Sequence, residues 1–215
     1  MKRRDFSKQL AGAGLGLAVA GAARAQGAPV EGKDYVKLQT AAPVTLATPQ
    51  KKIDVIEFFW YGCSHCFAFE PVLESWVKRL PADVQFRQVP FALIGPPEHQ
   101  KMFYALEEIG QREAMHRKLF SAIHVQGKRL NSEADITAFL VANGVDGAKF
   151  SEAYKSFAVN TLVSRGKQLS NAYKIDGVPA LGVHGRYYTA ASLAGTHERA
   201  VMVADYLIQR ARQPG

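Results

Sequence analysis

The sequence has almost no cysteine: only two of its 215 residues are cysteines, and both lie in the run Cys63-Ser64-His65-Cys66. No third thiol exists with which either of them could build a structural bridge. A bridge between the two closes too short a loop to stabilise a fold much. The sequence also lacks the second Cys-x-x-Cys pair, or the closely spaced histidines, that a zinc site requires. These absences argue against a disulfide framework and against a structural metal site.

Strong charge and sequence repeats are absent as well. The formal net charge is +8, and half of this excess lies in the first 25 residues. No basic run is interleaved with aromatic residues, so a nucleic-acid surface is not expected. No internal repeat or low-complexity tract follows residue 25. The 47% of apolar residues is an ordinary globular composition, sufficient for the core of one domain or of one domain with an insertion.

The first 25 residues have the pattern of an export signal. Basic residues precede a small, apolar stretch from Leu10 to Ala23, which is too short and too rich in glycine to span a membrane. Ala23-Arg24-Ala25 fits a cleavage site. The Arg-Arg pair at residues 3 and 4 resembles a twin-arginine motif, but secretory signals also contain such pairs, so both routes stay open. An exported protein works where disulfides persist.

Strand and helix patterns alternate after this leader. A short edge strand is predicted over residues 35–38, a buried strand over 53–60, a helix from Cys63 to about residue 80 and a strand over 84–91. The last three form one β-α-β unit, for which a right-handed crossover is expected. Residues 98–173 are almost wholly helical in pattern, with breaks at 110, 127–131, 143–144 and 146–147, which predicts three or four helices. Ser132 is predicted to cap the helix that follows the second break.

The C-terminal part returns to strands. Two strands are predicted over residues 180–183 and 186–188, joined by His184-Gly185, before a last helix that Thr196 caps and that runs to about residue 212. We therefore expect an α/β fold with a helical insertion. The predicted boundaries are a signal peptide over residues 1–25, an αβ domain formed by 26–95 and 174–215, and an inserted helical domain over 96–173.

The cysteine pair is expected to exchange disulfides. Two thiols three positions apart at the start of a helix lie on the same turn, where a disulfide can close and open with little movement. The helix N-terminus stabilises negative charge, so Cys63 is expected to be the exposed, reactive thiolate, with His65 adding positive charge. Cys66 lies one turn deeper and is expected to be shielded. A stabilised thiolate favours the dithiol form, which makes the pair an oxidant of other thiols.

A carboxylate interrupts the apolar strand that leads into the cysteines. Alternation along the strand allows Glu57 to lie on a solvated face, where a charge costs little free energy. A buried position beneath the cysteines, with a raised pKa, would instead suit a proton relay. The residues by themselves leave both interpretations open.

Two segments resemble a known family. Residues 55–67, with the sequence VIEFFWYGCSHCF, and Gly177-Val178-Pro179-Ala180 are similar to the DsbA-type thiol:disulfide oxidoreductases of the bacterial periplasm. The resemblance extends over nearly the whole mature chain in the order of its elements. It implies an α/β architecture that is a thioredoxin fold with an inserted all-helical domain.

The resemblance also implies roles for individual residues. The family's functional positions match Cys63 as the nucleophile, Cys66 as the buried cysteine, His65 as the residue that stabilises the thiolate, Glu57 as the buried proton-transfer group, and Val178-Pro179 as the cis-proline loop that pairs with the substrate backbone. The chain departs from the family at Ser64, where proline is most common, which leaves the redox potential open. It also departs at Arg87-Gln88, where the family tends to place a lysine that partners the buried glutamate.

These observations predict a periplasmic disulfide oxidase that passes the Cys63–Cys66 disulfide to exported, folding polypeptides through a mixed disulfide at Cys63. By resemblance, a membrane-bound DsbB-like quinone-linked oxidase restores the disulfide. We expect a monomer with no metal and no cofactor beyond the redox-active disulfide, and no nucleic-acid partner. A reductase or isomerase using the same cysteines is the alternative. A chaperone-like or metal-binding module with incidental cysteines is a third hypothesis.

Overall fold

The protein folds around a mixed sheet that carries the two cysteines at one end. The computed structural model describes residues 27–91 and 93–213, so the export signal predicted for residues 1–25 lies outside the described residues. The described strands follow the order β1-β5-β4-β2-β3. They are β1 (Val36–Lys37), β2 (Ile53–Phe59), β3 (Val84–Pro90), β4 (Ala180–Val183) and β5 (Tyr187–Ala190). The neighbours β2 and β3 run parallel, as the β-α-β prediction requires, and the other pairs are antiparallel.

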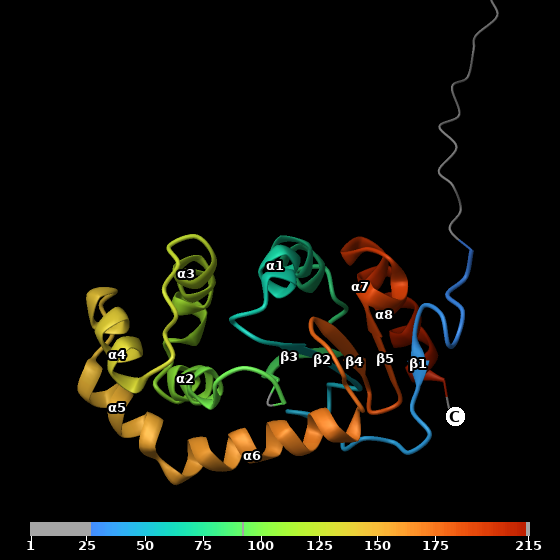
Figure 1. The fold of residues 1–215 in the computed structure, drawn as a ribbon. Helices are drawn as coiled ribbons and strands as arrows, with labels where there is room; N and C mark the ends of the chain where they lie inside the picture. Colours follow the sequence, from blue (N-terminus) through green and yellow to red (C-terminus); the bar gives the residue numbers. More distant parts are fainter. Residues whose placement is uncertain (1–26, 92, 214–215) are drawn as a thin grey trace, which may run out of the picture.

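Helices cover both faces of this sheet (Figure 1). On one face lie α1 (Ser64–Val77), which connects β2 to β3, and α8 (His197–Arg212), with the short α7 (Ala191–Ala194) before it. On the other face runs α6 (Phe157–Ala172). Among the described residues, no helix has the length and apolar character needed to cross a bilayer. The arrangement agrees with the predicted α/β class.

Between β3 and β4 the described residues form five helices, one more than the upper limit that the sequence pattern predicted. They are α2 (Pro97–Glu108), α3 (Arg112–His124), α4 (Glu133–Ala142), α5 (Gly147–Lys155) and α6. The additional boundary lies at Ser156, which ends α5 and whose hydroxyl caps α6 by accepting the N–H of Val159. No glycine or proline marks this break, so the sequence pattern predicted one helix where the structure has α5 and α6. The predicted caps Ser132 and Thr196 are confirmed.

Strand β2 lies between β4 and β3 and is buried on both faces, and its side chains alternate between two cores. All seven of its residues are buried. Ile53 and Val55 pack into the core that α1 and α8 share with the sheet, whereas Ile56 and Phe58 pack into the core beneath α6. Because side chains alternate across a strand, Glu57 lies on the face of Val55, toward α1.

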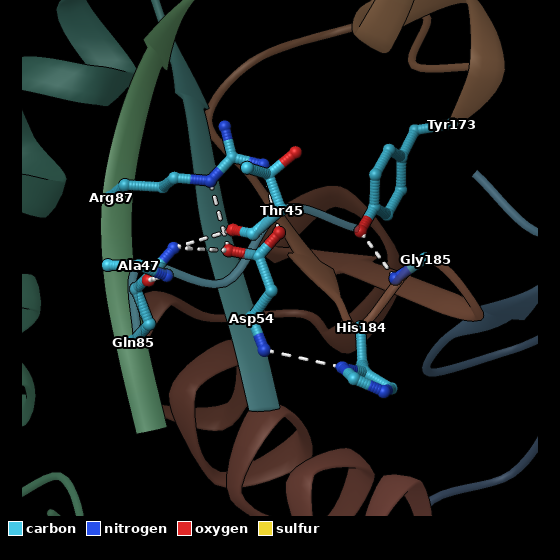
Figure 2. A network of polar contacts seen from close by, with 8 residues as sticks. All are labelled: Thr45, Ala47, Asp54, Gln85, Arg87, Tyr173, His184 and Gly185. Carbon is cyan, nitrogen blue, oxygen red and sulfur yellow. Dashed lines mark hydrogen bonds and ion pairs between the residues drawn. The ribbon is translucent and has the colours of Figure 1, made fainter. Parts of the chain in front are cut away.

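A polar network fixes the start of β2, at the end of the sheet away from the cysteines (Figure 2). The buried carboxylate of Asp54 accepts two hydrogen bonds from Arg87 of β3, at 2.9 and 2.8 Å. The backbone N–H of Asp54 donates to Nδ1 of His184 at 3.4 Å, and the hydroxyl of Tyr173 accepts the N–H of Gly185 at 2.7 Å. His184 and Gly185 form the predicted hairpin turn with φ of 50° and 64°. The network therefore ties β2 to β3 and to the β4–β5 hairpin.

Candidate active site

The two cysteines lie where β2 gives way to α1. Cys63 is the N-cap of α1 and has an extended backbone. Its sulfur accepts the backbone N–H of Cys66 at 3.3 Å, in the position that a capping oxygen usually holds. Both residues are free thiols, and Cys63 is half-buried whereas Cys66 is buried. The predicted placement of an accessible first cysteine and a shielded second one is confirmed.

The surroundings of Cys63 favour its thiolate. The thiol of Cys66 donates a hydrogen bond to it, the backbone N–H groups of Cys66 and His65 add to this, and the charge of His65 contributes least of these. Together they lower the pKa of Cys63 to about 6 against the opposing effect of burial. Burial raises the pKa of Cys66 above the ordinary thiol range. The sequence argument gave His65 more weight than the structure does, because the exposed imidazole is screened by solvent.

The predicted Val178-Pro179 loop lies directly against the cysteines. The peptide bond between Val178 and Pro179 is cis. The Cys63 thiol donates a hydrogen bond to the carbonyl oxygen of Val178 at 3.4 Å, across 115 positions of sequence. Strand β4, which follows this loop, pairs with β2 so that Ala180 lies opposite Phe58, which places the loop and the turn after β2 at the same end of the sheet.

Two side-chain contacts hold the turn before Cys63. The indole of Trp60 packs over Gly62, where an added Cβ would overlap the ring. On the other side, Nε2 of His124 donates to the carbonyl oxygen of Tyr61 at 2.8 Å. The His124 ring stacks on Phe67 with centroids 5.0 Å apart and an angle of 8° between the planes. The helical insertion, through α3, therefore fixes the turn that presents the thiol.

A groove opens beside the cysteines. It has a volume of about 550 Å³ and lies between the Val178-Pro179 loop and the start of α8. His65 lines one side, and His197 and Glu198 line the other. The predicted substrate-binding residues Val178 and Pro179 line this groove as well.

Glu57 is buried under the cysteine helix. Its side chain is 0% exposed, so the alternative of a solvated face is wrong. Strand β2 has a neighbouring strand on each side and helices on both faces, and the hydrophobic pattern of one strand does not show this. Burial, followed by the nearby charge of Glu70, raises the pKa of Glu57 well above its usual value. Its Oε1 atom has no hydrogen-bond partner within residues 27–91 and 93–213.

Gln88 occupies the place opposite Glu57 that the family resemblance gives to a lysine. The two residues are in register between β2 and β3, and Nε2 of Gln88 donates to Oε2 of Glu57 at 2.8 Å. Arg87 points to the other face, where it pairs with Asp54. A neutral amide therefore replaces a cation next to the buried carboxyl group.

The sequence analysis missed three polar residues that surround this pair. Nε2 of His116 in α3 lies 3.2 Å from Nε2 of Gln88 and 3.3 Å from Oε2 of Glu70 in α1. Nδ1 of His116 lies 2.9 Å from the Tyr61 hydroxyl. Glu70 could have been found, because it follows Cys66 by four positions and so shares its helix face. His116 gave no such signal, because its partners come from other elements.

The arrangement has the parts of a thiol–disulfide exchange site. An accessible thiol of lowered pKa lies at a helix N-terminus, a shielded thiol lies within bonding reach, and a protonatable carboxyl group lies behind the second thiol. Within the described part of the chain, no cluster of three or more His, Cys, Asp or Glu side chains has the geometry to hold a metal ion.

Known proteins are similar to this chain in sequence and in fold. A family model described as "DSBA-like thioredoxin domain" matches residues 97–201. The chain is 42% identical over 183 residues to the thiol:disulfide interchange protein DsbA of Pseudomonas aeruginosa, which covers 84% of this chain and 85% of that protein. It is 41% identical over 217 residues to the protein of the same name in Bordetella pertussis, with 99% and 100% covered.

Solved structures give the same answer. The crystal structure of Pseudomonas aeruginosa DsbA superposes with a TM-score of 0.78 at 42% sequence identity, over 84% of this chain and 93% of that one. The oxidoreductase NmDsbA1 of Neisseria meningitidis superposes with a TM-score of 0.72 at 25% identity, over 85% and 94%. The predicted thioredoxin fold with a helical insertion is confirmed.

Proposed function

Because the chain belongs to the DsbA family of thiol:disulfide interchange proteins, we propose that it donates the Cys63–Cys66 disulfide to exported polypeptides as they fold. One observation carries this proposal. Cys63 combines half exposure, an N-cap position and a pKa lowered to about 6, so that its thiolate is the more stable form at neutral pH. A stabilised thiolate stabilises the dithiol, and a stable dithiol makes the disulfide a strong oxidant.

The exchange proceeds in two steps. A substrate thiolate attacks Sγ of Cys63, a substrate–Cys63 bond forms, and the Cys63–Cys66 bond breaks. Cys66 leaves as a thiolate and takes the proton of the Glu57 carboxylic acid. A second substrate thiolate then attacks the substrate sulfur of the mixed disulfide and expels the Cys63 thiolate. The substrate loses two electrons, and the cysteine pair gains them.

The groove gives the substrate a place to bind. The backbone of an extended polypeptide pairs with the Val178-Pro179 loop, which brings its thiolate to the accessible sulfur of Cys63. His65 borders both the sulfur and the groove and supports the thiolate by its charge. A substrate held in extended form exposes its cysteines, as an unfolded exported chain does.

The family and the predicted leader support the cellular setting that we propose. We place the mature chain in the periplasm as a monomer, with its signal peptide ending at residue 25 and its helical insertion over residues 96–173. The dithiol left by each exchange is reoxidised by a membrane-bound, DsbB-like quinone-linked protein. The disulfide itself serves as the only redox group.

The test is oxidation of a reduced peptide that contains two cysteines. The oxidised wild-type protein should form the peptide disulfide and become a dithiol, and the Cys63→Ser variant should form none. Cys66→Ser serves as the matched control, since it keeps the Cys63 thiol. With glutathione disulfide as the oxidant, it should accumulate the Cys63–glutathione mixed disulfide, because no Cys66 thiol displaces the glutathione. Equilibration in glutathione buffers gives the direction of transfer. A wild-type disulfide that resists reduction there and leaves the peptide reduced would overturn the proposal.

A further inference from the structure

A second carboxyl group lies behind the cysteines, and one imidazole lies between the two. Glu57 of β2 is 0% exposed and Glu70 of α1 is 6% exposed. Each has an Oε1 atom without a hydrogen-bond partner in the described residues. His116, 7% exposed, reaches Oε2 of Glu70 at 3.3 Å and the Gln88 amide nitrogen at 3.2 Å, and that nitrogen donates to Glu57 at 2.8 Å. Two ionised carboxylates in such a site repel each other unless a cation balances them.

The imidazole has a partner in either protonation state. Arg112 donates to Oε1 of Gln88 at 3.0 Å, which turns the amide nitrogen toward His116. When His116 is neutral, its Nε2 lone pair accepts that amide N–H. When His116 is protonated, its Nε2–H donates to Glu70 instead, and Nδ1–H can bond the Tyr61 hydroxyl in both cases. The site therefore accommodates a change of charge without rearrangement of its backbone.

We propose that His116 is a positioning residue for proton transfer to and from Cys66. Its imidazolium donates to Glu70, and its positive charge compensates the negative charge that Glu57 acquires on giving its proton to the Cys66 thiolate, while Gln88 keeps its hydrogen bond to Glu57. In the reverse direction, the Glu57 carboxylate takes the proton of the Cys66 thiol while Cys66 closes the disulfide. The inference rests on the proposed function, because it assigns a task to the same site.

The charged groups around this cluster act in opposite directions. Those that face it are Glu57 on β2, Cys63, Cys66 and Glu70 at α1, Arg112 and His116 on α3, with Tyr61 before α1 and Glu107 at the end of α2. The charge of Glu70 opposes ionisation of Glu57, and the charge of Cys63 does so less strongly. A protonated His116 favours that ionisation. Removal of His116 and removal of Glu70 are therefore expected to have effects of opposite sign.

The experiment measures the step that depends on Cys66. Reduced full-length mature protein is mixed with excess glutathione disulfide, which forms a mixed disulfide at Cys63, and Cys66 then displaces glutathione. Acid quenching and mass spectrometry at a series of pH values give the rate of this closure. The variants are His116→Gln, Glu70→Gln and, as the matched control on the same helix, Lys118→Gln, which removes an exposed positive charge that contacts neither carboxyl group.

Opposite shifts of the closure profile are expected. His116→Gln should move its midpoint to higher pH by about one unit, which is about a tenfold slower closure below that midpoint. Glu70→Gln should move it to lower pH, and Lys118→Gln should leave it in place. The midpoint of Cys63 alkylation against pH should stay within a few tenths of a unit of the wild-type value in all three variants, since the charges of His116 and Glu70 act on Glu57 and Cys66.

Two results would overturn the inference. One is a His116→Gln profile that coincides with that of Lys118→Gln, and the other is a shift in the same direction for His116→Gln and Glu70→Gln. A common loss of packing would give the second result. Failure of the proposed function is a separate outcome, because it would show as a wild-type protein that does not oxidise the two-cysteine peptide.

Discussion

Removal of the Cys66 sulfur tests what stabilises the Cys63 thiolate. The thiol of Cys66 donates the hydrogen bond that contributes most, ahead of the backbone N–H groups and the charge of His65. Cys66→Ala removes this donor but keeps the backbone N–H, which bonds Cys63 at 3.3 Å. Cys66→Ser keeps a donor in the same place, because a hydroxyl also donates one hydrogen bond. We expect a higher pKa for Cys63 in the alanine variant and a nearly unchanged one in the serine variant.

The size of the shift follows from the bond and its exposure. A hydrogen bond to a charged acceptor contributes about 1.5–3 kcal/mol, and a thiol is a weak donor, so the lower end applies. Cys63 is only half-buried, and solvent screening reduces this to about 1 kcal/mol. Since one pKa unit corresponds to about 1.36 kcal/mol, the pKa should rise by roughly 0.7 units. His65→Asn, which removes the weakest contribution, should raise it by less.

The assay is thiolate absorbance in the ultraviolet as a function of pH. Each Cys66 variant contains a single thiol, so the absorbance reports Cys63 without interference. Alkylation rates at the same pH values provide an independent titration of the same sulfur. Equal pKa values in the alanine and serine variants would refute the reasoning, and so would a larger shift for His65→Asn than for Cys66→Ala.

Two further predictions concern stability. Since the folded dithiol has a Cys63 pKa lowered to about 6, its thiolate stabilises that form fully above the ordinary thiol pKa, and the effect is lost as pH falls through 6. Between pH 7 and pH 5, the free energy of unfolding of the dithiol form, measured in urea, should therefore fall by about 1 kcal/mol relative to that of the disulfide form, after allowance for screening. A difference between the two forms that does not change with pH would contradict this. Asp54→Asn should lower the free energy of unfolding by about 2 kcal/mol, because it leaves the part-buried Arg87 without its carboxylate (Figure 2), while peptide oxidation at the distant cysteines stays unchanged. Asp83→Asn, which breaks the more exposed pair with Arg212, is the control and should cost less than 1 kcal/mol; equal losses would refute the importance of burial.

The local pattern was sufficient for most of the fold. Strong periodicity located β2, α1 and β3, and the side-chain caps of α4 and α8 were read from Ser132 and Thr196. The α5–α6 boundary at Ser156 was missed, because a cap without glycine or proline looks like a helix interior. The beginning of a helix or strand depends on residues that are close in the sequence, and for this reason most of the boundaries could be predicted.

The candidate site divides in the same way. Cys63 at a helix start and Cys66 one turn deeper follow from their spacing along one helix. The burial of Glu57 does not, because it requires β3 and β4 to flank β2 and helices to cover both faces. Likewise, only the register between β2 and β3 decides that Gln88, and not Arg87, contacts Glu57.

The sequence by itself determined which thiols react, because the reactivity of Cys63 arises within one turn of one helix: the N-cap, the N–H groups and Cys66 are all local. The tertiary structure alone decided what surrounds them. Val178 reaches Cys63 across 115 positions, and His116 of the helical insertion meets Glu70 of the cysteine helix. Such contacts depend on how separate elements pack in space, and the number of residues between two positions does not show whether they touch.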